Sequence, residues 1–259
     1  MDTHYVHPAL LEHRIRVLVV GAGGNGGLVL DHLTRLHQAL LAWGHPGGLH
    51  VTLMDGDTVS ETNCVRQSFS VSDIGHPKTT VLINRYNVFK GLDWTALPTM
   101  LGPHSSLYSS SAYDIVIGCV DTKSARRALA TLLTNRNCCR VDYYIDLGNS
   151  ESTGQFILGE PRNLRNQDHA ERLPCVFELF PEIIKGTEDP GPSCSAAEAL
   201  DRQGPMINSC VVAPAIALLT TLLRKGAITH QGGFVAADRG VCEPVMIDFS
   251  AKKPLRRKA

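Results

Sequence analysis

A glycine-rich turn between an apolar run and a helical pattern constrains the fold of this chain more than any other feature. Residues 16–20 read Arg-Val-Leu-Val-Val without alternation, and residues 21–26 read Gly-Ala-Gly-Gly-Asn-Gly. Leucines then recur at helical spacing as far as residue 41. A β-branched run of this kind is typical of a strand buried on both faces of a parallel sheet. The sequence therefore predicts a strand, a tight turn and a helix in direct succession, as at the start of an α/β fold.

The same alternation of strands and helices continues along the chain. We expect strands near residues 50–55, 114–119, 140–147 and 155–158, helices near 77–89, 122–135 and 207–224, and a hairpin formed by 233–237 and 245–249. These patterns predict a doubly wound, Rossmann-like α/β fold. Its sheet is mostly parallel, with helices on both faces and an antiparallel extension near the C-terminus.

The expected domain organisation is a single domain over residues 1–259 with one irregular insertion. Residues 159–195 hold five prolines and two cysteines but no periodic apolar pattern. A loop of this length within a compact domain is usually functional. We therefore expect the insertion to take part in the function of the chain.

Composition excludes several classes of function. The 25 Lys and Arg residues balance 25 Asp and Glu residues, so we expect no general affinity for nucleic acid. The longest apolar run, at 210–223, is shorter than the roughly 20 residues that a membrane span needs, and we expect it to form a core helix. Eight cysteines without a signal peptide before them indicate a reduced, cytoplasmic protein.

The glycine turn also predicts the kind of ligand. Glycines let backbone N–H groups approach a phosphate at the N-terminus of a helix. In such folds an acid at the end of the second strand holds a ribose hydroxyl, and Asp55 stands there, followed by Asp57. Both acids fit a nicotinamide dinucleotide and ATP equally well, and Asp57 is also explained by turn chemistry. The candidate glycines are Gly21, Gly23, Gly24 and Gly26.

Two cations and a third acid bear on the choice between these nucleotides. Arg66 and Lys78 follow the two acids within a short stretch. Attack of a carboxylate on an α-phosphate develops negative charge, which fixed cations and Mg²⁺ stabilise, whereas hydride transfer puts no charge on a phosphate. Asp121 ends a strand at the carboxyl edge of the sheet, where we expect it to hold Mg²⁺, to cap the following helix, or both.

The combination of these motifs resembles the ThiF, MoeB and ubiquitin-activating enzyme family. The motifs are, in order, the Gly-x-Gly-Gly-x-Gly loop, Asp55-x-Asp57, Asn63-x-x-Arg66-Gln67, Pro77-Lys78 and the strand-end Asp121. A weaker likeness follows, similar to ThiF-family proteins of bacterial ubiquitin-like operons, including the PRTRC type. It consists of Pro192-Ser193-Cys194, Ala197-Glu198-Ala199-Leu200, Gln203 and Asn208.

The resemblance implies an activity, its cofactors and its partners. The family uses ATP and Mg²⁺ to adenylate the C-terminal glycine carboxylate of a small ubiquitin-like or sulfur-carrier protein, and many members then pass the acyl group to a cysteine. The implied partners are this carrier, a downstream conjugating protein and a second copy of the chain in a homodimer. The implied nucleotide contacts are the glycine loop, Asp55, Asp57, Asn63, Arg66, Gln67 and Lys78, with Asp121 on Mg²⁺. No zinc is expected, because the two Cys-x-x-Cys pairs of bacterial relatives are absent from this sequence.

The cysteine expected to carry a thioester is Cys194. A thioester needs an exposed thiolate near the adenylate, and Cys194 lies in the irregular insertion just before an expected helix start, where the helix dipole favours a thiolate. Cys175, in the same insertion, is the second candidate, and an inert loop cysteine is the alternative. Two other functions stay open: an NAD-dependent oxidoreductase, which leaves Arg66 and Lys78 without a role, and a non-catalytic adaptor that docks the carrier.

Overall fold

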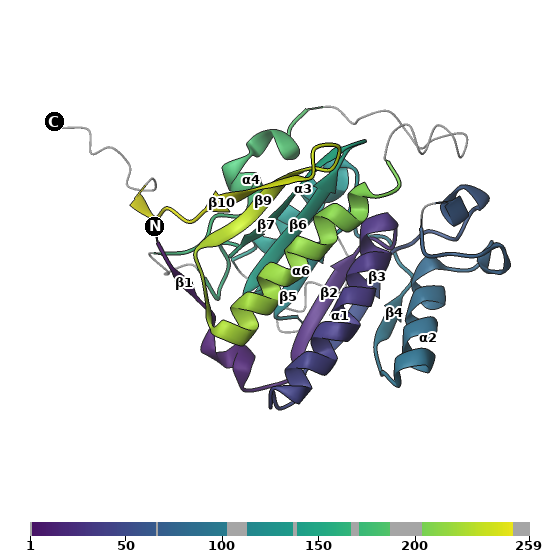
Figure 1. Cartoon of the computed structure of the whole chain (residues 1–259), viewed down its shortest axis with the longest axis horizontal. Coiled ribbons are helices and arrows are strands. Elements are labelled where there is room, and N and C mark those ends of the chain that lie inside the picture. Colours follow the sequence, from purple (N-terminus) through teal and green to yellow (C-terminus); the bar gives the residue numbers. More distant parts are fainter. Residues whose placement is uncertain are drawn as a thin grey trace.

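The chain folds around an eight-stranded sheet with the strand order β10-β9-β7-β6-β5-β2-β3-β4 (Figure 1). It is seen in a computed structural model that describes residues 2–65, 67–102, 113–136, 139–166, 171–186 and 204–250. The five strands from β4 to β6 run parallel, and β7, β9 and β10 continue the sheet in antiparallel pairs. The strands are β2 (Ile15–Val20), β3 (Leu49–Met54), β4 (Thr95–Leu97), β5 (Ile115–Gly118), β6 (Tyr143–Asn149), β7 (Thr153–Gly159), β9 (His230–Ala236) and β10 (Val241–Met246).

Helices cover both faces of this sheet. Figure 1 shows α1 and α6 packed together over one face, and their apolar residues form one core cluster with those of α2. The second cluster, on the other face, contains apolar residues of α3 and α4. The helices are α1 (Gly24–Ala42), α2 (Lys78–Lys90), α3 (Lys123–Leu133), α4 (Val176–Leu179) and α6 (Ile207–Lys225), with 3₁₀ turns η1 (Pro8–Leu11), η2 (Glu61–Val65), η3 (Val71–Asp73) and η5 (Pro181–Ile183).

Strand β2 shows why an unalternating apolar run belongs in the middle of such a sheet. Val17 and Val19 point into the cluster under α1 and α6, whereas Leu18 and Val20 point into the cluster under α3. All four side chains are buried. Successive side chains of a strand alternate between the two faces, so a strand covered on both sides needs apolar residues at every position.

Helix α6 is long and apolar enough to cross a membrane by length and composition, yet 56% of its most apolar window is buried inside the protein. It packs on α1 and on strands β6, β7 and β9. Residues such as Val211, Leu219 and Leu222 are fully buried in this contact. The helix therefore occupies the position of a core helix, as expected from the sequence.

The predicted fold class is confirmed, and the differences lie at the edges. The edge strand β4 and the small antiparallel pair of β1 (His4–Tyr5) with β8 (Ala227–Ile228) were not predicted. Each has only two or three residues, too few for a hydrophobic period to be recognised. The last strand of the hairpin begins at Val241, earlier than predicted, because most of β10 is exposed and its apolar pattern is weak.

The irregular insertion is described over residues 159–166 and 171–186. These parts follow β7 and carry α4 and η5, which pack against the α3 face of the sheet. Cys194 lies outside the described residues. The domain boundaries expected from the sequence remain a prediction.

Candidate functional site

The sheet has a topological switch point between β2 and β5. The chain goes from β2 outward to β3 and β4, then returns to build β5 and β6 on the other side of β2. In open α/β sheets, ligands bind beyond the carboxyl ends of the strands at such a point. A cavity of about 350 Å³ lies there, lined by the loops that follow β2, β3 and β5. We call it the switch-point cavity.

The glycine loop lies so close to the neighbouring strand end, and to itself, that side chains are excluded at Gly21 and Gly26. Gly21 has a φ of 102°, a left-handed conformation that favours glycine, and a Cβ there would come within 2.6 Å of the carbonyl oxygen of Cys119. A Cβ on Gly26 would overlap the carbonyl group of Gly21. Gly21, Gly23 and Gly24 line the cavity, whereas Gly26 allows the loop to close beneath it.

The N-terminus of α1 faces the cavity without a side-chain cap. Gly23 is the N-cap residue, with extended backbone, and as a glycine it makes no side-chain cap hydrogen bond. The first N–H groups of a helix have no partner within the helix, and together with the helix dipole they attract anions. This end of α1 is therefore built to receive a phosphate or carboxylate.

Asp55 joins the glycine loop to the end of β3. One carboxylate oxygen accepts a hydrogen bond from the backbone N–H of Ala22 at 2.6 Å, and the other accepts from the N–H of Asp57 at 2.7 Å. Two backbone donors hold this carboxylate at the cavity wall. Its remaining lone pairs suit a pair of ribose hydroxyls, which donate hydrogen bonds.

Lys78 is buried at the start of α2 and reaches the cavity from there. Its Nζ lies 3.0 Å from a carboxylate oxygen of Asp57, and its backbone N–H donates to the Asp57 carbonyl at 3.0 Å. Only 7% of Lys78 is exposed, and a buried ammonium needs a partner of opposite charge. Asp57 thus positions the ammonium group of Lys78. This role goes beyond the turn chemistry by which the sequence also explained Asp57.

Of the expected site residues in the segment between Asp57 and Lys78, some line the cavity and others do not. Gln67 lines it, and its Oε1 is buried with no hydrogen-bond partner among the described residues. Asn63 instead accepts a hydrogen bond from the backbone N–H of Ser60 at 3.0 Å and is not among the lining residues. Arg66 lies outside the described residues, so its role remains a prediction.

Asp121 lies exposed at the mouth of the switch-point cavity. The alternative role considered for it, as the cap of α3, belongs to Thr122, whose Oγ1 accepts a hydrogen bond from the N–H of Ala125 at 3.2 Å. The sequence pattern placed the cap one residue early. The carboxylate of Asp121 is therefore not used in capping the helix.

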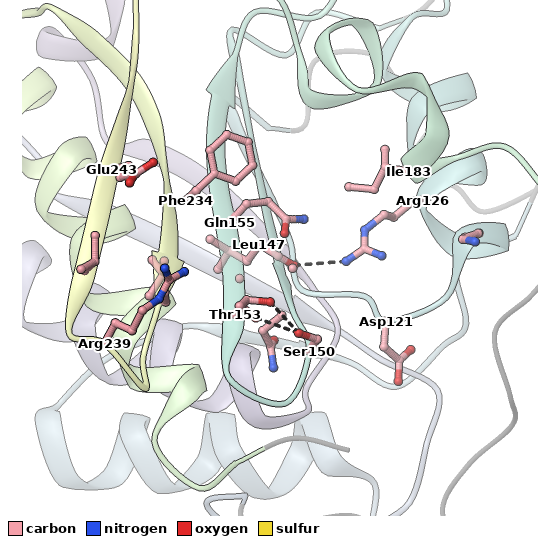
Figure 2. A pocket seen from close by; sticks show the side chains of 17 residues that line it. Asp121, Arg126, Leu147, Ser150, Thr153, Gln155, Ile183, Phe234, Arg239 and Glu243 are labelled. Atoms are coloured by element: carbon pink, nitrogen blue, oxygen red, sulfur yellow. Dashed lines mark hydrogen bonds between the residues drawn. The ribbon is translucent and has the colours of Figure 1, made fainter. Parts of the chain in front are cut away.

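A second, larger hollow adjoins the first. It has a volume of about 550 Å³ and lies between α3, the ends of β6 and β7, and the β9–β10 hairpin (Figure 2). Asp121 and Asn149 line both hollows, so the two meet at these residues. We call the second hollow the hairpin groove; it was not predicted from the sequence, because its walls come from four distant segments.

A buried acid holds a cation at the wall of the hairpin groove. Arg126 extends from α3 into the groove in Figure 2, and its Nε lies 3.4 Å from Oδ1 of Asp146, which also accepts a hydrogen bond from the Tyr144 hydroxyl at 2.8 Å. Asp146 is fully buried, and burial raises the pKa of its carboxyl even though Arg126 and the hydrogen bonds act in the opposite direction. Arg126 therefore has a fixed direction in the groove.

Two of the described cysteines, Cys175 and Cys119, are poor nucleophiles. Cys175 is fully buried at the N-terminus of α4, so the second thioester candidate lacks the exposure that a thioester requires. Cys119 lines the cavity, but burial and the nearby Asp146 raise the pKa of its thiol. Of the two candidates in the insertion, Cys194 alone remains, outside the described residues.

The lining of the switch-point cavity fits a nucleoside triphosphate with Mg²⁺. The glycine loop and the open helix end suit phosphates, and Lys78 supplies a buried positive charge. Among the described residues no three His, Cys, Asp or Glu side chains are grouped to hold a metal by themselves. Mg²⁺ does not need such a group, because it is usually held by one or two carboxylates together with substrate phosphates.

Comparisons with known proteins agree with this geometry. The ThiF family matches residues 11–241. The sulfur carrier protein adenylyltransferase of Thermus thermophilus is 28% identical over 213 residues, which cover 80% of this chain and 69% of that protein. The adenylyltransferase and sulfurtransferase UBA4 of Yarrowia lipolytica is 29% identical over 114 residues, 43% of this chain, and the matched part spans only 26% of that longer relative.

A further relative and two solved structures extend the comparison. The ATP-dependent ubiquitin transferase-like protein Cap2 of Enterobacter hormaechei is 23% identical over 118 residues, 44% of this chain and 18% of that protein. Two structures of E. coli MccB, one with succinimide and one with MccA-N7isoASN, superpose with TM-scores of 0.58 and 0.61 at 19% and 17% identity. They cover 90% and 92% of this chain, and 63% and 65% of the MccB chains, and show a shared fold.

Proposed function

This chain belongs to the ThiF family, and from that premise we propose that it is an adenylyltransferase that uses ATP to activate the C-terminal glycine carboxylate of a small ubiquitin-like or sulfur-carrier protein. The observation that carries the proposal is the meeting of two hollows. The lining of the switch-point cavity suits phosphates, and the cavity meets the hairpin groove at Asp121 and Asn149, where a volume of about 550 Å³ offers room for a peptide end.

Different residues of the switch-point cavity bind different parts of the nucleotide. Asp55 accepts hydrogen bonds from the ribose, and the glycine loop and the N-terminus of α1 donate to the phosphates. The apolar side chains of Met54, Leu101 and Val120 line the same cavity and offer a surface for the adenine ring. Gln67 offers its unpaired Oε1 to a donor on the nucleotide.

Lys78 and Asp121 then act on the charge that develops at the phosphates. A carboxylate oxygen of the carrier attacks the α-phosphorus, and the bond to pyrophosphate breaks. Lys78 stabilises the leaving negative charge, and Arg66 is proposed to do the same. Mg²⁺ held by Asp121 would neutralise phosphate charge when bound. The product is an acyl-adenylate, in which AMP is a good leaving group.

A second step is proposed on Cys194. Its thiolate attacks the acyl carbonyl, a thioester forms and AMP leaves. A homodimer, a conjugating partner and a cytoplasmic location complete the proposal. The main support for this second step is the position of Cys194 in the insertion that follows β7.

The test is ATP–pyrophosphate exchange with a candidate carrier that ends in glycine. We expect carrier-dependent exchange that falls by about 10²–10³-fold in Asp121→Ala. Glu12→Ala is the matched control, because Glu12 is exposed and precedes β2, at the opposite end of the sheet. Binding of ATP without exchange would support a non-catalytic adaptor, and binding of NADH in preference to ATP would support an oxidoreductase; either result overturns the proposal.

A further inference from the structure

Three asparagine side chains form a chain of hydrogen bonds that ends at the junction of the two hollows. Asn208 Nδ2 donates to Asn25 Oδ1 at 2.7 Å, and Asn25 Nδ2 donates to Asn149 Oδ1 at 2.8 Å. Asn208 and Asn25 are 4% and 7% exposed, so solvent does not compete for these bonds. They lie in the first turns of α6 and α1, and Asn149 is the last residue of β6.

The chain of amides has a direction, and this direction fixes what Asn149 presents. Each asparagine amide has one acceptor oxygen and one donor nitrogen. Because Asn25 donates to Oδ1 of Asn149, Nδ2 is the end of Asn149 that is left to interact elsewhere. That Nδ2 is buried and has no hydrogen-bond partner among the described residues. A buried donor without an acceptor costs free energy, which a ligand oxygen at this position would recover.

The position of Asn149 indicates which kind of ligand its Nδ2 would contact. It lines both the switch-point cavity and the hairpin groove, whereas Asn25 and Asn208 line the cavity alone. A peptide carboxylate that approaches a nucleotide from the groove must pass this junction. Three cations, Lys123, Arg126 and Arg239, line the groove against two acids, Asp121 and Glu243, so a negatively charged peptide end is favoured there.

We propose that Asn149 binds the C-terminal carboxylate of the peptide in the hairpin groove, and that Asn25 and Asn208 are positioning residues that keep its amide N–H₂ turned toward that carboxylate. The inference rests on the proposed function for the identity of the peptide. The hydrogen bond selects a peptide with a free C-terminus over one whose terminus is blocked, because a carboxylate accepts from an amide N–H₂ more strongly than a neutral group does.

The experiment measures peptide binding separately from catalysis. The full chain is saturated with an α,β-methylene analogue of ATP, which does not release pyrophosphate, and titrated with a labelled peptide that ends in Gly-Gly. The same peptide with a C-terminal amide is the comparison. We expect wild type to bind the free acid about 10- to 100-fold more tightly than the amide, the range expected for a hydrogen bond to a charged group.

Variants then assign this preference to Asn149. Asn149→Asp keeps the acceptor for Asn25 but replaces the donor with a carboxylate oxygen, and Asn149→Ala removes both. Each variant is titrated at its own saturating concentration of the ATP analogue, and we expect each to lose the preference for the free acid. Asn208→Ala is expected to lose part of the preference, and to add no loss in an Asn149→Ala background. Asn84→Asp, on the exposed side of α2, is the matched control.

Several results would overturn the inference. The first is a wild type that does not bind the free acid more tightly than the amide. The second is an Asn149→Asp variant that keeps this preference. The third is an Asn149→Asp variant that binds the ATP analogue more weakly but binds both peptides as wild type does. A preference for the free acid in a chain without pyrophosphate exchange would instead refute the proposed function and leave the inference standing. Pyrophosphate exchange at the wild-type rate in Asn149→Asp would instead refute the inference and leave the proposed function standing.

Discussion

Replacement of Gly26 by alanine tests the packing that makes the switch-point cavity possible. The new Cβ would lie 2.9 Å from the carbonyl carbon of Gly21 and closer still to its oxygen, so the loop and the helix must move apart. Both groups are backbone, and no side-chain rotation relieves the overlap. Gly26 lies in the first turn of α1, where alanine favours the helical state by up to about 1 kcal/mol.

The overlap outweighs the gain in helix propensity. Overpacking in a close-packed interior costs about 1–3 kcal/mol, and an overlap with backbone belongs at or above the upper end. We therefore expect a net loss of about 2 kcal/mol or more, which lowers the unfolding temperature by about 4–8 °C for a chain of this size. ATP binding should also weaken, because the overlap moves the loop relative to Asp55, and a misplacement of about 1 Å can cost up to about 10²-fold.

The assays are thermal unfolding and calorimetric titration with ATP. Gly23→Ala is the matched control for stability, because its Cβ would meet only Nε2 of Gln67, at 4.0 Å. We expect this control to unfold close to wild type, with at most the small penalty of alanine at an N-cap. The reasoning is refuted if Gly26→Ala unfolds at the same temperature as Gly23→Ala and binds ATP as wild type does.

Three further substitutions probe the cavity, the far end of the sheet and the insertion. Lys78→Met leaves Asp57 without its cation and should lower pyrophosphate exchange by about 10²–10³-fold, whereas an undiminished rate would remove Lys78 from the mechanism. Asp114→Asn should destabilise the protein at pH 7. Burial alone would raise the pKa of Asp114, but hydrogen bonds from Arg16 and His13 lower it overall. The greater stability of wild type over the variant should therefore be present above pH about 4 and shrink as the pH falls through the lowered pKa. Unfolding curves across pH would contradict this if the difference persisted at pH 2. Cys194→Ala should abolish a reductant-sensitive conjugate with the carrier on non-reducing gels, and its persistence would move the thioester elsewhere.

The fold class and the kind of cavity follow from local patterns. A β-branched run marks β2, a glycine turn follows it, and a helical pattern marks α1, so each level of the sequence indicates the same arrangement. Asp55 and Lys78 were found by their positions after such elements, and the structure places both at the cavity. Asn63 was assigned to the same cavity but turns instead toward Ser60, because a short polar side chain in a 3₁₀ turn bonds readily to nearby backbone.

By itself, the sequence determined the sheet, the glycine loop and the strand ends that line the switch-point cavity, because period, turn chemistry and strand ends are properties of neighbouring residues. Only the tertiary structure decided how the site continues beyond this cavity. Asn149 meets Asn25 across 124 positions, and Asn25 meets Asn208 across 183. A hydrogen bond between such distant residues depends on how α1, α6 and β6 pack, and their packing is specified by the whole core rather than by any segment. The hairpin groove follows from the same packing.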